Sequence, residues 1–465
     1  MRDTQLVMRI HSQAAIVGRA VVALALICTA SACNVDRLLN TKDKDTSSPG
    51  QINSKAGLPN ARAGAISQFQ VAFGGSAAQS GNANEGHVNM TGLFTDEYID
   101  LETFPTRIAI DNRIAAPGNG TMRGIYLDLS QARVSAERAA GLYKKYDSTN
   151  VLRAEMLNLA GYSYVLFAEN YCSGVPFDSV SFTGAVTYGL PLPTDSIYAR
   201  ALADFTAASP IAVADSVANG DPKGIEQIDL ARVGRARVLL DLGQFAAALA
   251  VADSVPTSFV YSIEGSTNSP RENNGVWYFS SQLAFSVADS EGINGLNFVS
   301  AADPRVPTFN TGGPGFSGTG PNFIAEEKYA DPTAPIPVAT GLETRLIDAE
   351  ARLRAGDVAG WTSGLNGARS DSGFAPLTPD STVTAGTTLQ QNVMFRERAF
   401  WLYLTAHRLS DLRRLVRQYG RGPETVFPTG TDAITGAPYG SAVDFPVSSD
   451  ETNNPNFHGC INTSA

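Results

Sequence analysis

The sequence has little cysteine, little histidine and little charge. Its 465 residues include four Cys and four His, too few and too scattered for a zinc cluster or a disulfide-built fold. Charged residues make up only 17%, no Lys/Arg-rich run occurs, and the net charge is −10. A surface for nucleic acid or anionic membranes is therefore not expected. The 43% apolar content, with 43 Gly and 25 Pro, excludes a coiled coil, a disordered tail and a multi-span membrane protein.

The first 33 residues predict an exported protein. Arg2, Arg9 and Arg19 precede a short apolar stretch, and small residues then lead to Cys33. We interpret residues 1–32 as a signal peptide. Because small residues before a Cys resemble the bacterial lipobox, we expect Cys33 to be lipidated, with ordinary signal cleavage beside a chance Cys as the alternative. Residues 33–50 are polar and are typical of a lipid-anchored tether.

Helical patterns occur in pairs along the rest of the chain. Apolar and small residues recur at helical spacing over 125–146 and 151–171, 228–242 and 244–255, and 343–355 and 358–369. Gly243 and Gly356 follow the first helix of the last two pairs, where left-handed backbone geometry is easily reached. The pairs are typical of degenerate tetratricopeptide-like hairpins. One further helix is predicted over about 389–417.

Three long stretches, 80–124, 255–342 and 420–465, lack a helical pattern and are predicted to be functional loops or small folded units. The expected fold class is therefore mainly α, with helical hairpins and long loop-rich insertions that form a ligand-binding part. We divide the mature chain into an N-terminal helical-repeat part, 51–255, with the loop 80–124, and a C-terminal part, 256–465. The C-terminal part comprises a loop-rich segment (256–342), helices (343–417) and an irregular tail (420–465).

The sequence contains no convincing catalytic motif. The glycines of 313–318 have the spacing of a dinucleotide-binding loop, but no βαβ pattern surrounds them, so we predict a flexible loop. His407 and Asp411 lie one helical turn apart without a nucleophile, which indicates a structural pair on a helix surface. The adjacent acids at 96–97 and 326–327 should point apart, whereas glycosidase carboxylates face each other. We predict no enzyme, no cofactor and no metal site.

Several blocks of the sequence together resemble the SusD/RagB family. They are the lipobox, 153–177, 345–357 with the following Leu365-Asn366-x-x-Arg369, and 395–415, in the family's order and over most of the mature chain. The resemblance implies a surface-exposed outer-membrane lipoprotein of degenerate tetratricopeptide helices with a loop-rich ligand-binding part. It also implies a role in nutrient uptake, in which the protein is a lid on a TonB-dependent transporter and captures glycans or, less often, peptides.

Two alternatives to this function remain. One is a helical-repeat scaffold lipoprotein of outer-membrane assembly, and the other, less favoured, is a surface glycan hydrolase. Glycan and peptide both remain open as ligands.

Cys172 and Cys460 are the two cysteines that remain once the signal peptide is removed and Cys33 is lipidated. In an oxidising exported compartment they are expected to form a disulfide that ties the tail to the end of the 151–171 helix. Two free thiols are the alternative.

Loop aromatics are the candidates for ligand binding, because sugars are held by flat aromatic faces while polar side chains reach their hydroxyls. Two clusters qualify, at 94–113 and 273–279; the first also resembles, by position only, a loop region of the SusD/RagB site. The candidate residues are Tyr98, Phe104, Arg107, Arg113, Asn273, Trp277 and Tyr278. For each cluster the alternative is that the aromatics fill the core beneath a loop.

Overall fold

The computed structural model describes residues 49–78, 82, 84–181, 185–377 and 387–464. The expected signal peptide, the lipidated Cys33 and nearly all of the tether lie outside these residues. The chain forms two units: residues 1–52, of which only the short helix α3 (Pro49–Ile52) is described, and residues 53–465. Among the described helices, none combines the length and the apolar character needed to cross a bilayer.

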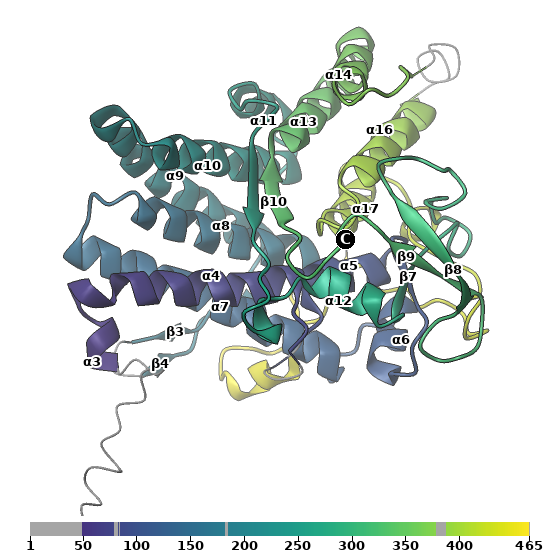
Figure 1. The fold of residues 1–465 in the computed structure, drawn as a ribbon, viewed down its shortest axis with the longest axis horizontal. Helices are drawn as coiled ribbons and strands as arrows, with labels where there is room; N and C mark the ends of the chain where they lie inside the picture. Colours follow the sequence, from purple (N-terminus) through teal and green to yellow (C-terminus); the bar gives the residue numbers. More distant parts are fainter. Residues whose placement is uncertain (1–48, 79–81, 83, 182–184, 378–386, 465) are drawn as a thin grey trace, which may run out of the picture. The chain divides into compact units, whose positions relative to one another are not determined.

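Helices dominate the second unit and pack one against the next in nearly sequential order (Figure 1). They are α4 (Leu58–Gly74), α7 (Gly120–Tyr146), α8 (Leu152–Asn170), α9 (Thr194–Asn219), α10 (Pro222–Asp241), α11 (Phe245–Ala252), α13 (Gly341–Arg354) and α14 (Val358–Asp371). The three predicted pairs are α7 with α8, α10 with α11, and α13 with α14. The predicted mainly α fold built from helical hairpins is confirmed.

Close helix packing depends on glycines that face a single aromatic ring. Phe205 on α9 lies between α8 and α10, and a Cβ atom added at Gly161 or Gly234 would come within 2.7 or 2.3 Å of its ring. The same ring packs edge-on against Tyr162 at a centroid distance of 5.1 Å. Small residues at these two positions therefore allow three helices to share one aromatic core residue.

Two helices that show no simple apolar pattern were not predicted. They are α4 and α9, and α9 carries Pro210 in its interior. The predicted start of α10 is six residues late, although Asp221 and Pro222 form an ordinary start signal, in which the Asp221 side chain accepts a hydrogen bond from the Lys223 amide at 2.9 Å.

The expected loops also contain regular structure. The stretch 80–124 includes α5 (Gly86–Phe94), β1 (Tyr98–Asp100) and α6 (Pro105–Asp111), and 255–342 includes α12 (Gly275–Ser281). All sheets in the described residues are antiparallel strand pairs: β1 with β7 (Phe285–Val287), β6 (Val260–Ile263) with β10 (Ile336–Thr340), β8 (Thr308–Pro314) with β9 (Asn322–Glu326), β2 (Val175–Pro176) with β5 (Pro191–Leu192), and β3 (Ser179–Val180) with β4 (Val186–Thr187).

The prediction of one helix over 389–417 is wrong. The chain forms α16 (Thr387–Trp401) and α17 (Arg408–Arg417), separated by a turn in which Leu404 and Ala406 have φ angles of 49° and 60°. Left-handed backbone at non-glycine residues is strained and persists only where the surroundings hold it. The turn carries neither Gly nor Pro, so none of its residues signals an interruption of the helix.

Buried groups from other elements hold this turn in place. The Glu97 carboxylate accepts a hydrogen bond from the Leu404 amide at 3.0 Å, and the Tyr403 hydroxyl donates one to the Glu97 carbonyl at 3.1 Å. The Tyr329 hydroxyl donates to the Leu404 carbonyl at 2.8 Å, and the Lys328 ammonium donates to the Tyr403 carbonyl. The turn therefore forms only together with the segments around 97 and 328.

Helix α17 carries buried arginines that reach several other elements. Arg408 forms a bidentate pair with Asp96 at 2.6 and 2.7 Å, and Arg414 binds Glu350 on α13 and Asp411 on its own helix. Arg413 donates to the carbonyls of Ala168, Glu169 and Tyr171 at the C-terminal end of α8. These contacts join α8 and α13 of the helical hairpins to the stretch 80–124.

The predicted surface location of His407 and Asp411 is also wrong, because both are buried. The Nε2 atom of His407 lies 3.2 Å from a Glu343 oxygen, and Asp411 accepts from Arg398 at 2.9 and 3.0 Å. Their role is structural, but it lies in the charge network around α17 and not on a helix surface.

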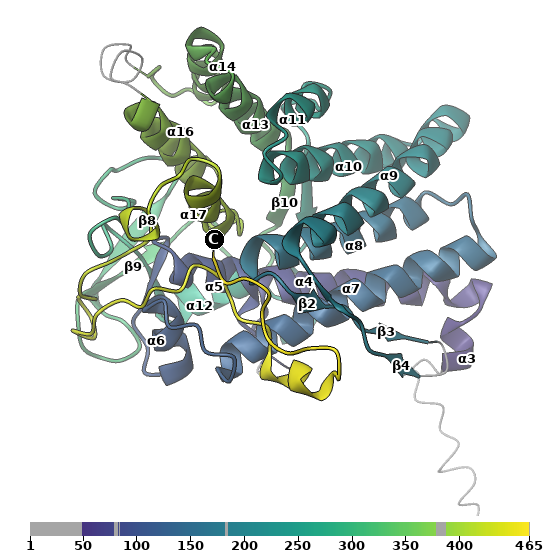
Figure 2. The same ribbon diagram turned by 180° about the vertical axis from the view of Figure 1, so that it is seen from behind.

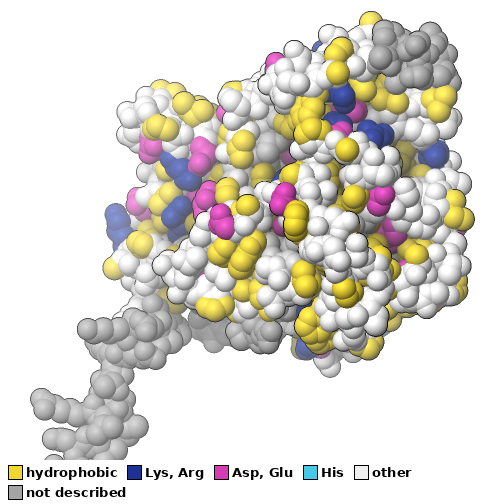
Figure 3. Space-filling view, turned by 45° about the vertical axis from the view of Figure 1, so that its right-hand side comes forward, with side chains coloured by type: hydrophobic (Ala, Val, Ile, Leu, Met, Phe, Trp, Pro, Cys, Tyr) yellow, Lys and Arg dark blue, Asp and Glu magenta, His cyan; other side chains and the backbone are white. Residues whose placement is uncertain are grey.

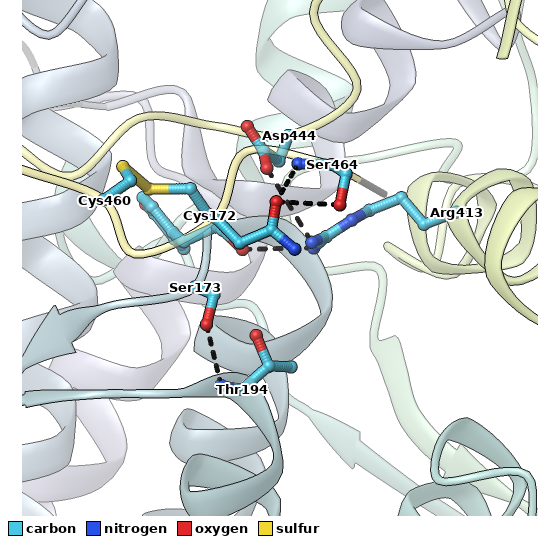
Figure 4. The surroundings of a disulfide bond; sticks show 9 residues. Cys172, Ser173, Thr194, Arg413, Asp444, Cys460 and Ser464 are labelled. Carbon is cyan, nitrogen blue, oxygen red and sulfur yellow. Dashed lines mark hydrogen bonds and ion pairs between the residues drawn. A yellow bond between two sulfur atoms is a disulfide. The ribbon is translucent and has the colours of Figure 1, made fainter.

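The C-terminal tail crosses the end of α8 and is bonded to it covalently. Cys172 and Cys460 form the expected disulfide, with Cα atoms 6.0 Å apart (Figure 4). Backbone hydrogen bonds join Cys172 to Phe445 at 2.9 Å and Ser173 to Asn462 at 2.9 Å. Seen from behind in Figure 2, the tail passes below α17 and in front of α5 and α12.

Replacing both bridged cysteines, Cys172→Ser with Cys460→Ser, should lower the free energy of unfolding by about 2–5 kcal/mol, because the bridge closes a very long loop. The sequence separation is 288 residues. Urea unfolding of the oxidised wild type, the reduced wild type and the double variant would measure the loss. Equal stability of all three would contradict the expectation.

Glu97 predicts a pH dependence of stability. Burial raises its pKa from 4.5 to about 8, although the Leu404 amide acts in the opposite direction. Folding therefore takes up a proton between pH 4.5 and pH 8, and the contribution of this carboxyl to stability is lost as pH rises through that range. Glu97→Gln keeps the acceptor oxygen and cannot titrate.

The free energy of unfolding of the wild type should fall more steeply with pH than that of Glu97→Gln, by up to about 1.4 kcal/mol per pH unit. Urea unfolding across this pH range compares the two slopes, to which all other buried acids contribute equally. Parallel curves for the two proteins would show that Glu97 does not take up a proton on folding.

Candidate functional site

The framework of the site is a close crossing of three chain segments. The end of α4, the start of α5 and the start of α12 meet at Gly75, Gly86 and Gly275. A Cβ atom at Gly86 would lie 2.2 Å from the Gly75 nitrogen, and one at Gly275 would lie 2.5 Å from the Gly74 carbonyl oxygen. No other residue fits such contacts. The crossing fixes α12 against the residues that follow α4 and precede α5.

Helix α12 is further fixed at its first turn by Asn274. The Asn274 side-chain oxygen accepts from the amides of Val276 and Trp277 at 2.8 and 3.0 Å, and its amide nitrogen donates to the Ala334 carbonyl at 2.9 Å. An N-cap of this kind orients the helix as well as stabilising it. The consecutive half-buried aromatics Trp277 and Tyr278 are therefore held in defined positions.

A cavity of about 480 Å³ opens between α12, α6 and the β8–β9 hairpin; we call it cavity A. Its walls carry the aromatic side chains of Phe104, Tyr278, Phe279 and Phe316. The remaining lining residues are Ala78, Asn82, Asn84, Glu85, Glu102, Thr106, Arg107, Gly120, Thr121, Gln282 and Ala284. Phe104 and Phe316 are 48% and 56% exposed, so both side chains are accessible to a ligand.

Arg107 is the only cation among the described lining residues of cavity A, and its charge is fully compensated. Its Nε donates to Glu85 at 2.9 Å and its Nη1 donates to Glu102 at 2.8 Å. The guanidinium carbon lies 4.7 Å from the centre of the Phe104 ring and 4.9 Å from that of Phe279. Burial lowers the pKa of Arg107, but the two carboxylates outweigh it and raise the pKa overall. Cavity A thus carries no excess positive charge.

Phe316 reaches cavity A because the glycine-rich hairpin crosses β1 closely. The Phe316 amide donates to the Leu283 carbonyl at 2.8 Å, and the Ser317 amide donates to the Leu101 carbonyl at 2.9 Å. A Cβ atom at Gly315 would lie 2.4 Å from the Leu101 Cβ. The glycine motif at 313–318 is thus part of a β-hairpin connection that places an aromatic residue.

A second cavity, cavity B, of about 510 Å³ lies on the other side of α12. It is lined by Trp277, Ser280, Ser281, Leu283, Phe309, Ala325, Glu326, Glu327, Tyr329 and Ala330. Phe309 is 58% exposed, whereas Glu326 is only 4% exposed. Burial raises the pKa of Glu326 to about 7. The hydrogen bond that its carboxylate accepts from the Tyr329 amide at 2.9 Å acts in the opposite direction and lowers the pKa.

The structure separates the seven predicted ligand-binding residues into several groups. Phe104, Arg107 and Tyr278 come together in cavity A, and Trp277 lines cavity B. Asn273 lies in neither cavity and donates to the Ser266 carbonyl at 2.8 Å.

Tyr98 and Arg113 are fully buried. Tyr98 packs in β1 against Phe285, and Arg113 donates to the Pro428 carbonyl at 2.7 Å beneath the tail. Tyr98 thus matches the alternative that the aromatics fill the core beneath a loop, and Arg113 is buried as well.

Sequence reasoning missed Phe316, Phe309 and the polar side chains of Asn82, Asn84 and Gln282. Phe316 lies within the glycine-rich stretch 313–318 that was predicted to be a flexible loop, and Phe309 lies four residues before it. An aromatic residue within such a stretch was the available signal. In the described part of the chain, no group of three or more His, Cys, Asp or Glu residues is arranged to hold a metal ion.

No family model and no curated protein matches the sequence. Several solved structures match the fold. A SusD superfamily protein from Bacteroides vulgatus is 12% identical, with a TM-score of 0.59 over 87% of this chain and 98% of that one. A laminarin-binding SusD-like protein is 14% identical, with a TM-score of 0.61 over 88% and 99%. A SusD-like carbohydrate-binding protein from Bacteroides fragilis is 14% identical, with a TM-score of 0.59 over 87% and 99%.

These likenesses extend over nearly the whole of the solved proteins. The chain therefore has the SusD-like fold, and the resemblance stated from its sequence blocks is confirmed at the level of the fold.

Proposed function

We propose that the protein is a non-catalytic binding protein that captures a glycan in cavity A. The observation that carries the proposal is the set of aromatic side chains around cavity A, the exposed Phe104 and Phe316 and the half-buried Tyr278, beside uncharged polar side chains and the hydrogen-bonded group of Arg107, Glu85 and Glu102. The neighbours described as carbohydrate-binding and laminarin-binding support a glycan over a peptide.

The chemistry of cavity A suits a sugar. Aromatic rings pack against the C–H faces of pyranose rings, and the amides of Asn82, Asn84 and Gln282 can both donate to and accept from hydroxyl groups. Figure 3, which brings the β8–β9 side of the molecule forward, shows hydrophobic side chains scattered among uncharged surface, with few charged ones. Such a surface favours a neutral ligand over a highly charged one.

The two buried carboxylates of cavity A support binding over hydrolysis. Glu85 and Glu102 both accept hydrogen bonds from the Arg107 guanidinium, at 2.9 and 2.8 Å. A glycosidase requires one carboxyl that can donate a proton and a second that can attack or activate water across the sugar. Two carboxylates that share one cation are suited to holding Arg107 between its aromatic neighbours and not to the two roles that hydrolysis requires.

The protein is further proposed to deliver the glycan to a TonB-dependent outer-membrane transporter, as a lipoprotein anchored through Cys33 at the cell surface. The lipobox-like sequence and the SusD-like fold support this arrangement. Purification of the C-terminally tagged protein from outer membranes in mild detergent, followed by mass spectrometry, tests it. A stoichiometric transporter is the expected result, and envelope assembly factors in its place would favour the scaffold alternative.

Phe104→Ala and Tyr278→Ala should each weaken glycan binding about tenfold or more, because each removes an aromatic face from cavity A. A glycan array that includes laminarin would identify the ligand, and calorimetry would measure its affinity for each variant. Phe104 is half exposed, so its loss should leave the melting temperature nearly unchanged.

Tyr188→Ala is the matched control, because Tyr188 is 46% exposed and lines neither cavity. Wild-type affinity in both cavity variants, with the control also unchanged, would place the glycan elsewhere on the protein.

A further inference from the structure

Cavity B is as large as cavity A, but its walls have a different chemistry. Trp277 and Phe309 supply aromatic surface, and Glu326 and Glu327 supply two carboxylates. No Lys or Arg is among its described lining residues. The nearby Lys328 does not line the cavity: its ammonium donates a hydrogen bond to the Tyr403 carbonyl at the α16–α17 turn, although its charge still lowers the pKa of Glu326 against the larger, opposite effect of burial. An aromatic and acidic cavity without a lining cation attracts a positively charged group.

Several buried carboxyl groups in the described part of the chain have an oxygen without a hydrogen-bond partner, and Glu326 is the one among them that lines cavity A or cavity B. One carboxylate oxygen accepts from the Tyr329 amide at 2.9 Å, while the other, Oε1, is buried and has no hydrogen-bond partner among the described residues. Buried polar atoms are almost always hydrogen-bonded, so an unpartnered carboxylate oxygen in a cavity wall calls for a donor from outside the chain. A donor that also carries positive charge forms the strongest bond to a carboxylate.

The arrangement of α12 connects this second cavity to the first. Trp277 and Tyr278 are consecutive on α12, yet Trp277 lines cavity B and Tyr278 lines cavity A. The hairpin repeats the division, because Phe309 lines cavity B and Phe316 lines cavity A. The two cavities are therefore neighbours that share one short helix and one hairpin as their common wall.

We propose that cavity B binds an amino sugar unit with a free amine, which donates to Glu326 while its ring packs on Trp277 and Phe309. This proposal rests on the proposed function only in that the ligand is a glycan. It adds a second binding site, cavity B, and a preference for a sugar unit that carries a free amine. The protonated amine supplies both the donor that Glu326 Oε1 lacks and the charge that the aromatic faces attract. An N-acetylated amine has no charge, and a uronic acid would be repelled by the two carboxylates.

The test compares β-1,4-linked oligomers of equal length that differ only at the 2-position of each unit. Calorimetry near neutral pH measures binding of the glucosamine, N-acetylglucosamine and glucose oligomers to the wild type. The glucosamine oligomer is expected to bind about tenfold more tightly than the other two, the effect of one charge-assisted hydrogen bond. Equal affinity for all three oligomers, or no binding of the glucosamine oligomer, would overturn the proposal.

Two variants locate the preference. Glu326→Gln keeps an oxygen that can accept from the Tyr329 amide and removes the charge, so it should abolish the preference for the amine. Phe309→Ala, at a residue 58% exposed, should weaken binding of the glucosamine oligomer without loss of fold. Unchanged melting temperatures confirm that both variants are folded. An amine preference that survives Glu326→Gln would overturn the proposal.

Phe316→Ala is the matched control, because Phe316 belongs to the same hairpin, is 56% exposed and lines cavity A. It should leave the amine preference intact. If Phe316→Ala and Tyr278→Ala bind every oligomer normally while Glu326→Gln loses the amine preference, the proposal for cavity A fails and that for cavity B stands. The reverse pattern supports cavity A alone and overturns cavity B.

Discussion

The structure depends on the buried arginines of α17. Arg408, Arg413 and Arg414 reach a carboxylate beyond α5, the last carbonyls of α8 and a carboxylate on α13. Burying a charge is costly unless its partner is in place, and breaking such a pair leaves an uncompensated charge behind. Any other placement of α17 would therefore leave several charges unpaired. This requirement positions the stretch 80–124 against the helical hairpins more strictly than apolar packing alone would.

The charge network around α17 is connected to the cavities through one short segment, residues 96–102. Asp96 pairs with Arg408 and Glu97 holds the Leu404 turn, so the segment begins in the charge network. It then forms β1, the Leu101 carbonyl receives the Ser317 amide of the hairpin, and Glu102 accepts from Arg107 in cavity A. Seven residues of chain thus lead from the core of the fold to both the β8–β9 hairpin and Arg107, the cation of cavity A.

The sequence was sufficient to predict the helices wherever a local pattern determined the structure. The pairs α7 with α8, α10 with α11 and α13 with α14 carry apolar and small residues at helical spacing, and α13 is followed by Gly356 with a positive φ. The sequence was insufficient to predict the backbone conformation where groups distant along the chain determine it. The turn at Leu404 is set by Glu97 and Tyr329, more than 70 residues away along the chain. The candidates Phe104 and Tyr98 looked equivalent in sequence, yet one is half exposed and the other is in the core, because strand pairing with β7 buries the second.

The two aromatic neighbours on α12 show why the cavities need not move to bind. A helix of seven residues would be unstable alone, but α12 is capped by Asn274 and pressed onto the backbone at Gly74 and Gly75. Its orientation is therefore set before a ligand arrives, which lowers the entropy lost on binding. The same rigidity fixes the distance between the two cavities, so a ligand that occupies both must have the matching length between its units. Selectivity would then arise from the length of the ligand as well as from the chemistry of each unit.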